Sequence, residues 1–381
     1  MKTFDVAIIG GGVIGASIAF ELTGAKLRVA VFDRQEPGRE ASWAAAGMLS
    51  PAPESPRDLP LVPLGRESLR IYPEFVSSIE ESSGQSARLT RKGTLEVFGD
   101  ASGEEERDRR VSECCRLGLV AQPVALDEAR AWEPTLGEGA RAVAWLAEEG
   151  TVEPRSLTNA VVAAAERRGS EIHANCPVTG LIREGNRCTG VIAGGERISA
   201  VHIVVAAGSF SSQIADESGL FARYAPTRPV RGQMIALKPD GPSPRRVLRS
   251  ERGYLVPRQD GRIVAGSTSE HAGFDKRVTP EGMRKIFEAV LELCPQLAGA
   301  EVVETWSGLR PGTADDLPIL GPTAIEGLIV ATGHYRNGIL LAPVTAKLVR
   351  EWIVAGRTEF DADAFSPLRF CARKTQVRTA V

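Results

Sequence analysis

The stretch Asp5-Val-Ala-Ile-Ile-Gly-Gly-Gly-Val-Ile-Gly15 decides how the chain folds. Its first part, Val6 to Ile9, is an apolar and mostly β-branched run that is too short for a helix of its own, which indicates a buried strand. A helical pattern from Val13 to Thr23 comes after it. Three glycines join the two elements in the pattern G-x-G-x-x-G, namely Gly10, Gly12 and Gly15.

A second apolar strand, Leu27 to Asp33, completes a β-α-β unit and ends in an acid. In such a unit the three glycines allow a tight turn, close approach of a pyrophosphate and close helix–strand packing, and the helix N-terminus attracts phosphate. Asp33 is then expected to accept hydrogen bonds from ribose hydroxyls. An ordinary glycine-rich turn explains neither the triple glycine nor the acid, and a signal peptide conflicts with Asp5 and Glu21. The unit therefore predicts a site for the ADP half of a dinucleotide.

Composition narrows the class of protein. The 381 residues allow two domains, and a formal charge of −2 with 25% charged residues gives no reason to expect nucleic acid or an anionic membrane as a partner. No stretch is apolar enough to span a bilayer. The six cysteines form no C-x-x-C pair and the four histidines are scattered, so we expect no metal site and reduced thiols in the cytoplasm.

Further along the chain, the patterns predict a parallel α/β domain assembled from separate pieces of sequence, with an antiparallel domain inserted between them. Short alternating segments between residues 225 and 303 carry the antiparallel signal. The expected helices are 64–81, 104–117, 155–168, 209–217, 281–294 and 338–355. Three apolar strands end in glycine, at Gly10, Gly208 and Gly333. Because ligands of open parallel sheets sit beyond the carboxyl ends of the strands, these three ends should meet at the site.

Three stretches resemble the flavin-dependent D-amino-acid oxidase superfamily and, within it, the bacterial glycine oxidases: Ala44–Leu49, Gly308–Thr313 and Gly333–Pro343. The resemblance runs over nearly the whole chain. It implies FAD as cofactor and an α/β FAD-binding Rossmann-like domain plus an α+β substrate domain with an antiparallel sheet. The expected FAD-binding domain is 1–50, 64–88, 145–217 and 306–365. The expected substrate domain is 51–63, 89–144 and 218–305, and 366–381 forms a tail.

The resemblance also implies which residues touch FAD. Beside the glycine motif, Val13 and Ile14 belong to the pyrophosphate loop, and Asp33 and Arg34 form the ribose contact. The flavin-facing loop holds Ala41, Ser42, Ala46, Gly47 and Met48, Val178 lies on the adenine side, and Gly208 ends a strand. The stretch that wraps the flavin ring is His334, Tyr335, Arg336, Asn337, Gly338, Ile339 and Leu340. The chain departs from the family at Asp33, where Glu is usual, and at Trp43, where a small hydroxyl residue is usual. Trp43 therefore leaves the contact of its loop with the flavin open.

For the substrate, the resemblance points to Arg310, Arg336 and Tyr254. A guanidinium fork binds a carboxylate in two places and stays charged, so Arg310, expected in a Pro/Gly-framed turn, should hold the substrate carboxylate. Each assignment has an alternative. Arg310 could form a structural ion pair, Arg336 could brace its loop, and Tyr254 could be a core residue. His334 is expected to shape the loop by hydrogen bonding.

The activity implied by the resemblance is oxidative deamination of glycine, or of sarcosine or small D-amino acids, to the oxo acid, ammonia and hydrogen peroxide. Hydride transfer to flavin N5 needs no catalytic acid or base from the chain, because the cofactor supplies the chemistry. In thiamine biosynthesis the glycine imine would pass to thiazole synthase, and the family suggests a homotetramer. Alternatives are a D-amino-acid or sarcosine oxidase or dehydrogenase, a nicotinamide-dependent dehydrogenase and a non-catalytic FAD-binding subunit.

Overall fold

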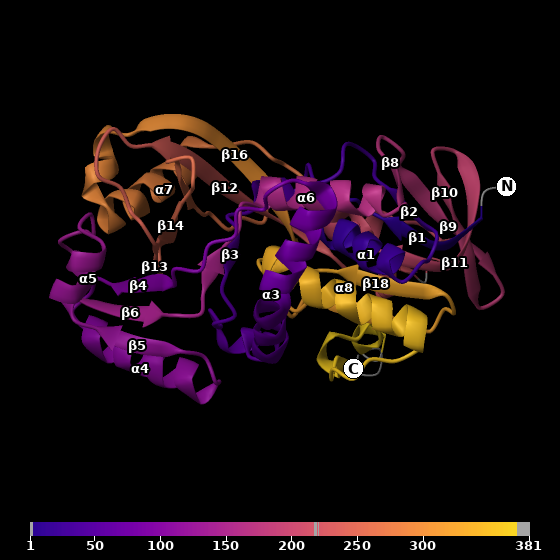
Figure 1. Cartoon of the computed structure of the whole chain (residues 1–381), viewed down its shortest axis with the longest axis horizontal. Helices are drawn as coiled ribbons and strands as arrows, with labels where there is room; N and C mark the ends of the chain where they lie inside the picture. The colour runs from indigo at the N-terminus through magenta and orange to yellow at the C-terminus, as the bar shows by residue number, and fades with distance from the viewer. Residues whose placement is uncertain (1–2, 217–218, 220, 372–381) are drawn as a thin grey trace, which may run out of the picture.

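The chain folds around two eight-stranded sheets that lie side by side along its long axis (Figure 1). A computed structural model describes residues 3–216, 219 and 221–371. The first sheet holds the N-terminal β-α-β unit, and the second holds strands from the middle of the chain that pair antiparallel except where residues 94–96 run parallel to residues 247–249. The predicted two-part α/β and antiparallel architecture is confirmed.

The first sheet has the order β17-β18-β11-β1-β2-β8, with β10 and β9 continuing from β11 as an antiparallel extension. Strands β18, β11, β1, β2 and β8 are parallel, and β17 is antiparallel to β18. The carboxyl ends of β1, β11 and β18 are therefore neighbours, as predicted from Gly10, Gly208 and Gly333. The strands are β1 Thr3–Ile9, β2 Val29–Phe32, β8 Glu171–His173, β9 Val178–Glu184, β10 Arg187–Ala193, β11 Glu196–Val205, β17 Ile319–Pro322 and β18 Leu328–Thr332.

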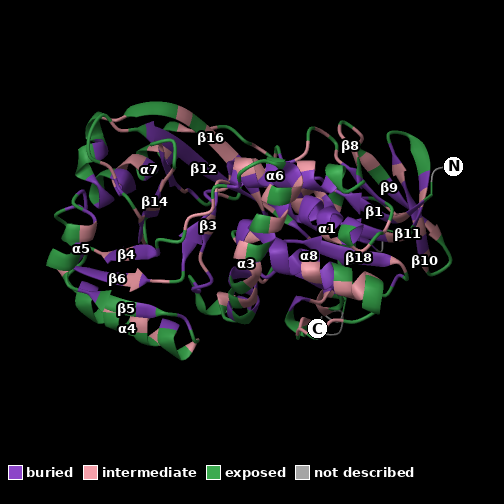
Figure 2. Ribbon diagram, in the orientation of Figure 1, coloured by how far each residue is buried: buried purple, intermediate pink, exposed green. Residues whose placement is uncertain are grey.

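Both faces of the first sheet are covered at its centre, which is why β2, β18 and residues 6–9 of β1 are buried and almost wholly apolar. Along β1, Val6 and Ile8 face a core shared with four helices, and Ala7 and Ile9 face a second core shared with the β9–β11 extension. The helix α1 is apolar all round and almost wholly buried (Figure 2), as expected for a helix at the centre of a core. The four helices are α1 Val13–Gly24, α3 Leu61–Ser83, α6 Pro154–Arg167 and α8 Gly338–Ala355.

The second sheet has the order β16-β12-β15-β14-β13-β4-β6-β5. Strands β12 and β16 pair in antiparallel register from Arg228 opposite Gly312 to Lys238 opposite Glu301, so β16 is a long edge strand. One face packs on α7 (Pro280–Leu293), and the other carries Met234, Ala236 and Val264, which pack against Ala46 and Met48 of the first half. The strands are β4 Thr94–Phe98, β5 Ala121–Val124, β6 Ala142–Leu146, β12 Arg228–Lys238, β13 Val247–Ser250, β14 Gly253–Pro257, β15 Ile263–Gly266 and β16 Glu301–Gly312.

The remaining elements connect the two sheets or cover their outer surfaces. Helices α4 and α5 lie at the far end of the second sheet (Figure 1). Helix α2 follows β2 and contacts both α6 and β16, so it lies at the junction of the two halves. These elements are α2 Ala41–Ala44, α4 Gly103–Arg116, α5 Leu126–Trp132 and α7 Pro280–Leu293, with a small two-stranded sheet of β3 Met48–Leu49 and β7 Gly150–Thr151. None of the described helices combines the length and the apolar character needed to cross a bilayer.

Some predicted elements differ from the structure. Residues 209–217 were expected to form an α-helix, but Gly208–Gln213 is a 3₁₀ helix and residue 217 lies outside the described part. Its serine hydroxyls bond elsewhere, Ser209 to the carbonyl of Leu309 and Ser211 to Thr332, and such side chains compete with α-helical bonding. Helix α3, which was expected to begin at residue 64, begins at Leu61. The first turn of a helix tolerates proline, so Pro63 does not prevent this earlier start.

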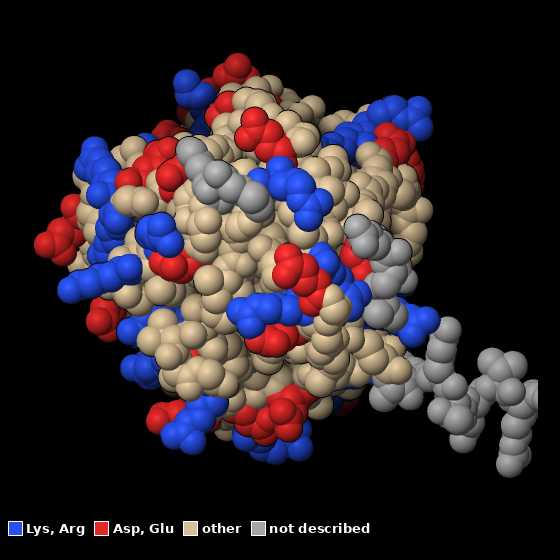
Figure 3. Space-filling model, turned by 90° about the vertical axis from the view of Figure 1, so that its right-hand side faces the viewer, with Lys and Arg blue, Asp and Glu red and all other residues tan. Residues whose placement is uncertain are grey.

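The C-terminal tail is partly folded. Residues 367–370 form a 3₁₀ helix, and the guanidinium of Arg369 bonds both oxygens of Asp315 at 2.9 and 3.1 Å, while 372–381 lie outside the described residues. On the face in Figure 3, basic and acidic side chains are interspersed, in agreement with the small net charge. The six cysteines are all free, and the described residues contain no cluster able to hold a metal ion.

Candidate active site

A cleft of about 510 Å³ lies between the two sheets and runs from the glycine loop after β1 to the inner face of the second sheet. Its lining includes the carboxyl ends of β1, β2, β11 and β18, the α2–β3 loop and the N-terminus of α8. From the second sheet it includes residues of β12, β13, β14 and β16. The arrangement confirms that the strand ends predicted from glycines converge on one cavity.

Two glycines of the glycine loop, Gly10 and Gly15, have no room for a side chain. Gly10 has a φ of +103°, and a Cβ there would lie 2.5 Å from the carbonyl oxygen of Ala206. A Cβ on Gly15 would lie 1.9 Å from the carbonyl oxygen of Gly10, so Gly15 allows α1 to pack on β1 and does not itself line the cleft. The N-terminus of α1 opens toward the cleft at Gly12, Val13 and Ile14, where it favours anionic groups.

Asp33 stands at the end of β2 and lines the cleft. Its carboxylate accepts hydrogen bonds from the backbone N–H of Gly11 at 2.7 Å and of Gln35 at 3.0 Å. Burial raises the pKa of Asp33, and these two bonds oppose that rise. Because a carboxylate accepts about four hydrogen bonds, the side chain keeps capacity for ribose hydroxyls.

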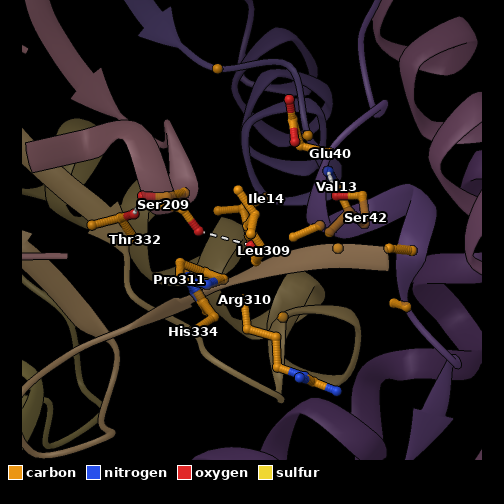
Figure 4. Close-up of a pocket in the computed structure, with 18 of the residues that line it drawn as sticks. Val13, Ile14, Glu40, Ser42, Ser209, Leu309, Arg310, Pro311, Thr332 and His334 are labelled. Carbon is orange, nitrogen blue, oxygen red and sulfur yellow. Dashed lines mark hydrogen bonds between the residues drawn. The ribbon is translucent and has the colours of Figure 1, made fainter. Parts of the chain in front are cut away.

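The loop that follows β2 brings its small residues to the cleft. Ala41, Ser42, Ala46, Gly47 and Met48 all line it, and the hydroxyl of Ser42 accepts a hydrogen bond from the N–H of Val13 at 2.9 Å (Figure 4). Across the cleft, Val178 and Gly208 line its other side.

Trp43 points out of this loop. It is not among the residues that line the cleft, and its ring lies between the guanidinium groups of Arg39 and Arg155, each 4.2 Å from the ring centroid. Arg155 in turn binds both oxygens of Glu304 on β16 at 2.8 and 2.9 Å. The departure from the family pattern at Trp43 therefore affects the junction of α2 with β16 and places no indole in the cleft.

The stretch after β18 turns the chain into α8. His334 is buried, its Nε2 lies 3.0 Å from the hydroxyl of Thr345, and burial lowers the pKa of the imidazole to about 3. A neutral, hydrogen-bonded ring agrees with the loop-shaping role expected for it. Tyr335, Arg336, Asn337, Gly338 and Ile339 line the cleft with His334. Leu340, predicted as a contact of the same kind, is not in the lining and lies in the core instead.

Arg310 is on the strand β16, opposite Val230 of β12, and not in the turn that its Pro/Gly neighbours suggested. Its guanidinium donates to the carbonyl of Thr268 at 3.0 Å and to the hydroxyl of Ser267 at 2.6 Å. Gly232 on β12 leaves room for it, since a Cβ there would come within 2.1 Å of Nη1. Both of these partners are neutral oxygens, and among the described residues no carboxylate forms an ion pair with Arg310, so its charge is free for an anionic ligand.

The other two predicted substrate residues also line the cleft. Tyr254 on β14 lies close to Met234, with its hydroxyl 3.3 Å from the sulfur. Arg336, however, is paired with Glu54 of the segment before α3. The structure thus gives Arg336 the bracing contact that was the alternative to substrate binding.

Comparison with known proteins identifies the family. The family described as FAD dependent oxidoreductase matches residues 5–352. The chain is 35% identical to a glycine oxidase of Geobacillus kaustophilus over 96% of this chain and 97% of that protein. A solved structure of glycine oxidase from the same organism superposes with a TM-score of 0.91 at 32% identity, covering 97% of this chain and 99% of that one.

The chain belongs to the FAD-dependent oxidoreductase family. Its place among the FAD-dependent amine oxidases makes FAD its cofactor. It is also 36% identical to a protein of Trichormus variabilis named bifunctional protein ThiO/ThiG, over 94% of this chain but 54% of that protein. The chain therefore spans about half the length of that relative.

The cleft of this FAD-dependent oxidoreductase fits its cofactor. Glycines without room for a Cβ and the N-terminus of α1 would hold the pyrophosphate, Asp33 the ribose, and the α2–β3 loop with the N-terminus of α8 the flavin. These individual roles remain predictions, but the structure brings the proposed residues to one cleft.

Several lining residues were not predicted. Among them are Glu40, Ser50, Glu54, Phe210 and Arg249. Arg249 is buried and binds Glu96 at 2.8 Å and Ser50 at 2.8 Å, and it lies opposite Tyr254 in the β13–β14 pair. No local pattern could have found Arg249, because its neighbours in the sheet come from β4 and β14, which are distant from each other in sequence.

Proposed function

We propose that the chain catalyses the FAD-dependent oxidative deamination of glycine, and of small amines such as sarcosine or small D-amino acids. Glycine, water and oxygen give glyoxylate, ammonia and hydrogen peroxide. The proposal is supported by relatives of matching length that are named glycine oxidase. The observation that carries it is Arg310, a guanidinium without a carboxylate partner among the described residues, at the second-sheet wall of the cleft.

The residues of the chain divide the work by position. Arg310 would bind the α-carboxylate through a charge-assisted hydrogen-bonded pair, and the contacts from Ser267 and Thr268 fix the direction of its guanidinium. Tyr254 and Met234 would bound the space left for a substituent on Cα, which favours small substrates. FAD, when bound, supplies the two-electron acceptor that oxygen regenerates.

The chain also supplies an electrostatic environment. The first residues of α8, Gly338 and Ile339, line the cleft, so the positive end of this helix faces it and stabilises negative charge there. His334 stays neutral at physiological pH because burial holds its pKa at about 3. We therefore assign no side chain as a general acid or base, and the amine enters the reaction in its neutral form with its proton lost to solvent.

One experiment tests the substrate class. The purified yellow protein is mixed anaerobically with glycine, sarcosine, D-alanine or D-proline, and bleaching of the flavin absorbance is followed before and after oxygen is admitted. Bleaching by glycine that oxygen reverses supports the oxidase. Bleaching only by D-alanine or D-proline would favour a D-amino-acid oxidase. Bleaching that oxygen does not reverse would favour a dehydrogenase. No bleaching with any amine would indicate a non-catalytic FAD-binding subunit, and a colourless protein a nicotinamide enzyme.

Arg310 provides the sharper test. Replacing it in Arg310→Ala should raise the KM for glycine by about 10- to 100-fold, because one charge-assisted hydrogen-bonded contact is lost. Arg310→Lys should keep part of the affinity, since it retains charge but not the fork. Steady-state peroxide release measures both. An unchanged KM in Arg310→Ala would show that the carboxylate is held elsewhere.

We also propose that the glycine imine feeds thiazole formation in thiamine biosynthesis. The support is the relative named ThiO/ThiG, in which a region similar to this chain is joined to a second part. A cytoplasmic homotetramer and transfer of the imine to thiazole synthase belong to the same proposal. Size-exclusion chromatography with light scattering tests the tetramer, and thiazole formation in a mixture with thiazole synthase tests the transfer.

A further inference from the structure

A segment of the second sheet reaches the part of the cleft where the ADP half of FAD is expected. Residues 270–277, between β15 and α7, extend from the sheet toward the loop that follows β2. The residues just before them, Ser267 and Thr268, hold Arg310. We call residues 270–277 the latch segment.

The start and middle of the latch segment are fixed to the second sheet. Arg231 of β12 pairs with Glu270 at 2.5 Å and with Asp275 at 3.1 Å, and the backbones of Arg231 and Glu270 exchange two hydrogen bonds. The hydroxyl of Ser307 on β16 donates to the carbonyl of Lys276 at 2.5 Å. Arg231 is itself buried, so the anchor is shielded from water and the latch segment holds a defined position.

The far end of the latch segment contacts the first half of the molecule in two places. Nζ of Lys276 lies 2.5 Å from a carboxylate oxygen of Glu40. The ring of Phe274 stacks on that of Phe210, with centroids 4.9 Å apart and an angle of 29° between the planes. Glu40 comes from the loop after β2, and Phe210 comes from the 3₁₀ helix after β11. Because β2 and β11 are the two neighbours of β1, the two contacts join the latch segment to the chain on either side of the glycine loop.

Glu40 and Phe210, which the latch segment contacts, line the cleft, whereas Lys276 and Phe274 do not. The Glu40 carboxylate also accepts a hydrogen bond from the side-chain amide of Gln35 at 3.0 Å, and it forms an ion pair with Arg34. The Cζ atom of Arg34 lies 3.5 Å from the centre of the Phe210 ring. Glu40 stands beside Ser42, the partner of Val13 (Figure 4). The arrangement is layered, with the latch segment outside, Glu40, Arg34 and Phe210 in the middle, and the cleft inside.

We propose that Phe274 and Lys276 form a latch that fixes Arg34, Glu40 and Phe210 around the ADP half of FAD and slows release of the cofactor. These are positioning residues, because they act through the lining and do not touch the cleft. Without the latch, Glu40 would keep its contacts with Arg34 and Gln35 and Phe210 its contact with Arg34, while the 3₁₀ helix that carries Phe210 would stay bonded to β16 through Ser209. What would be lost is the restraint that the latch segment places on the Glu40 and Phe210 side chains. The inference depends on FAD as cofactor and is independent of which amine is oxidised.

The test is FAD binding to the full chain without any amine present. Apoprotein is titrated with FAD, and quenching of flavin fluorescence gives the Kd, while dilution of the holoprotein gives the release rate. Lys276→Ala should weaken binding by about two- to five-fold, the range of an exposed ion pair, and the effect should fade at high salt. Phe274→Ala should weaken it by about two- to ten-fold without that salt dependence, because an aromatic pair is lost.

A matched variant separates the latch from general effects of charge. Arg277→Ala removes a cation from the next position, which pairs with Asp275 and not with Glu40, and it should leave the Kd for FAD unchanged because Arg231 still holds Asp275. A Kd in Lys276→Ala and Phe274→Ala equal to that of the parent overturns the proposal, as does an equal loss in Arg277→Ala. Because these readouts use no substrate, they stand even if glycine proves not to be the amine oxidised.

Discussion

At the scale of single residues, His334 shows how burial decides chemistry. Its ring is buried and bonded to Thr345, and burial lowers the pKa to about 3 from the usual 6.5. The unfolded chain binds a proton more readily than the folded one between these values. Stability from this group is therefore complete above pH 6.5 and is lost as pH falls toward 3, by up to about 1.4 kcal/mol per pH unit.

This sign gives a prediction for His334→Gln. At pH 7 the variant should be less stable than the parent by about 1 kcal/mol, because its bond to Thr345 is imperfect. At pH 5 the parent should have lost up to about 2 kcal/mol that the variant does not lose, so the difference should shrink or reverse. Urea unfolding at both pH values, with a fixed excess of FAD, measures it. A difference that is the same at pH 7 and pH 5 would mean that His334 does not titrate as described.

Arg310 and Arg336 show what the sequence can and cannot say about a residue. The resemblance placed both arginines at the cleft, and both line it. Only the folded chain shows that Glu54, far away in sequence, pairs with Arg336, while no described carboxylate pairs with Arg310. The choice between a ligand-binding and a structural arginine depends on such partners, which carry no local signal.

At the scale of elements, the pair of strands β12 and β16 presents Arg310. Gly232 on β12 lies beside the guanidinium, and a Cβ there would come within 2.1 Å of Nη1 and 2.4 Å of Cζ. The atoms it meets are the far end of a flexible side chain. Gly232→Ala should therefore move the guanidinium and leave the strands paired.

We expect Gly232→Ala to raise the KM for glycine by about ten-fold, a part of the effect of losing a charge-assisted hydrogen bond. Its melting temperature should stay within a few degrees of the parent. Gly241→Ala is the matched control, because a Cβ there meets nothing within 4 Å, and it should change neither value. Peroxide release and thermal melting measure the two quantities. A fall in melting temperature without a change in KM would contradict this account of Gly232.

The elements of the first sheet were the best predicted from sequence. Strand β1, helix α1 and strand β2 follow the predicted order because their apolar periods agree with the glycine motif. Strand β16 was missed as a strand around Arg310, since Gly308, Pro311 and Gly312 suggest a turn. Its long pairing with β12 overrides that local preference, and an edge strand tolerates Pro311. Tertiary pairing of this kind is invisible to a local pattern.

At the scale of the whole molecule, the cleft lies between the two sheets and is lined by residues of both. The first sheet contributes the ends of its strands to the lining, and the second sheet contributes residues of β12, β14 and β16. The Trp43–Arg155–Glu304 contacts and the latch segment join the halves at its edges. FAD bound in this cleft would contact both halves, so its binding energy adds to the stability of the complete fold and not of one half alone.

Removal of FAD should therefore lower the melting temperature of the whole chain in a single transition. Binding to the folded state alone adds about 2.7 kcal/mol when free FAD is 100 times its Kd, and about 1.4 kcal/mol more for each further tenfold increase. Thermal melting of apoprotein with increasing FAD measures this. FMN, which lacks the AMP part of FAD and keeps one phosphate, is the matched ligand and should shift the transition less, because Asp33 would have no ribose to bind and the glycine loop only one of the two phosphates. Equal shifts with FMN and FAD would contradict the assignment of that end of the cleft to the ADP half.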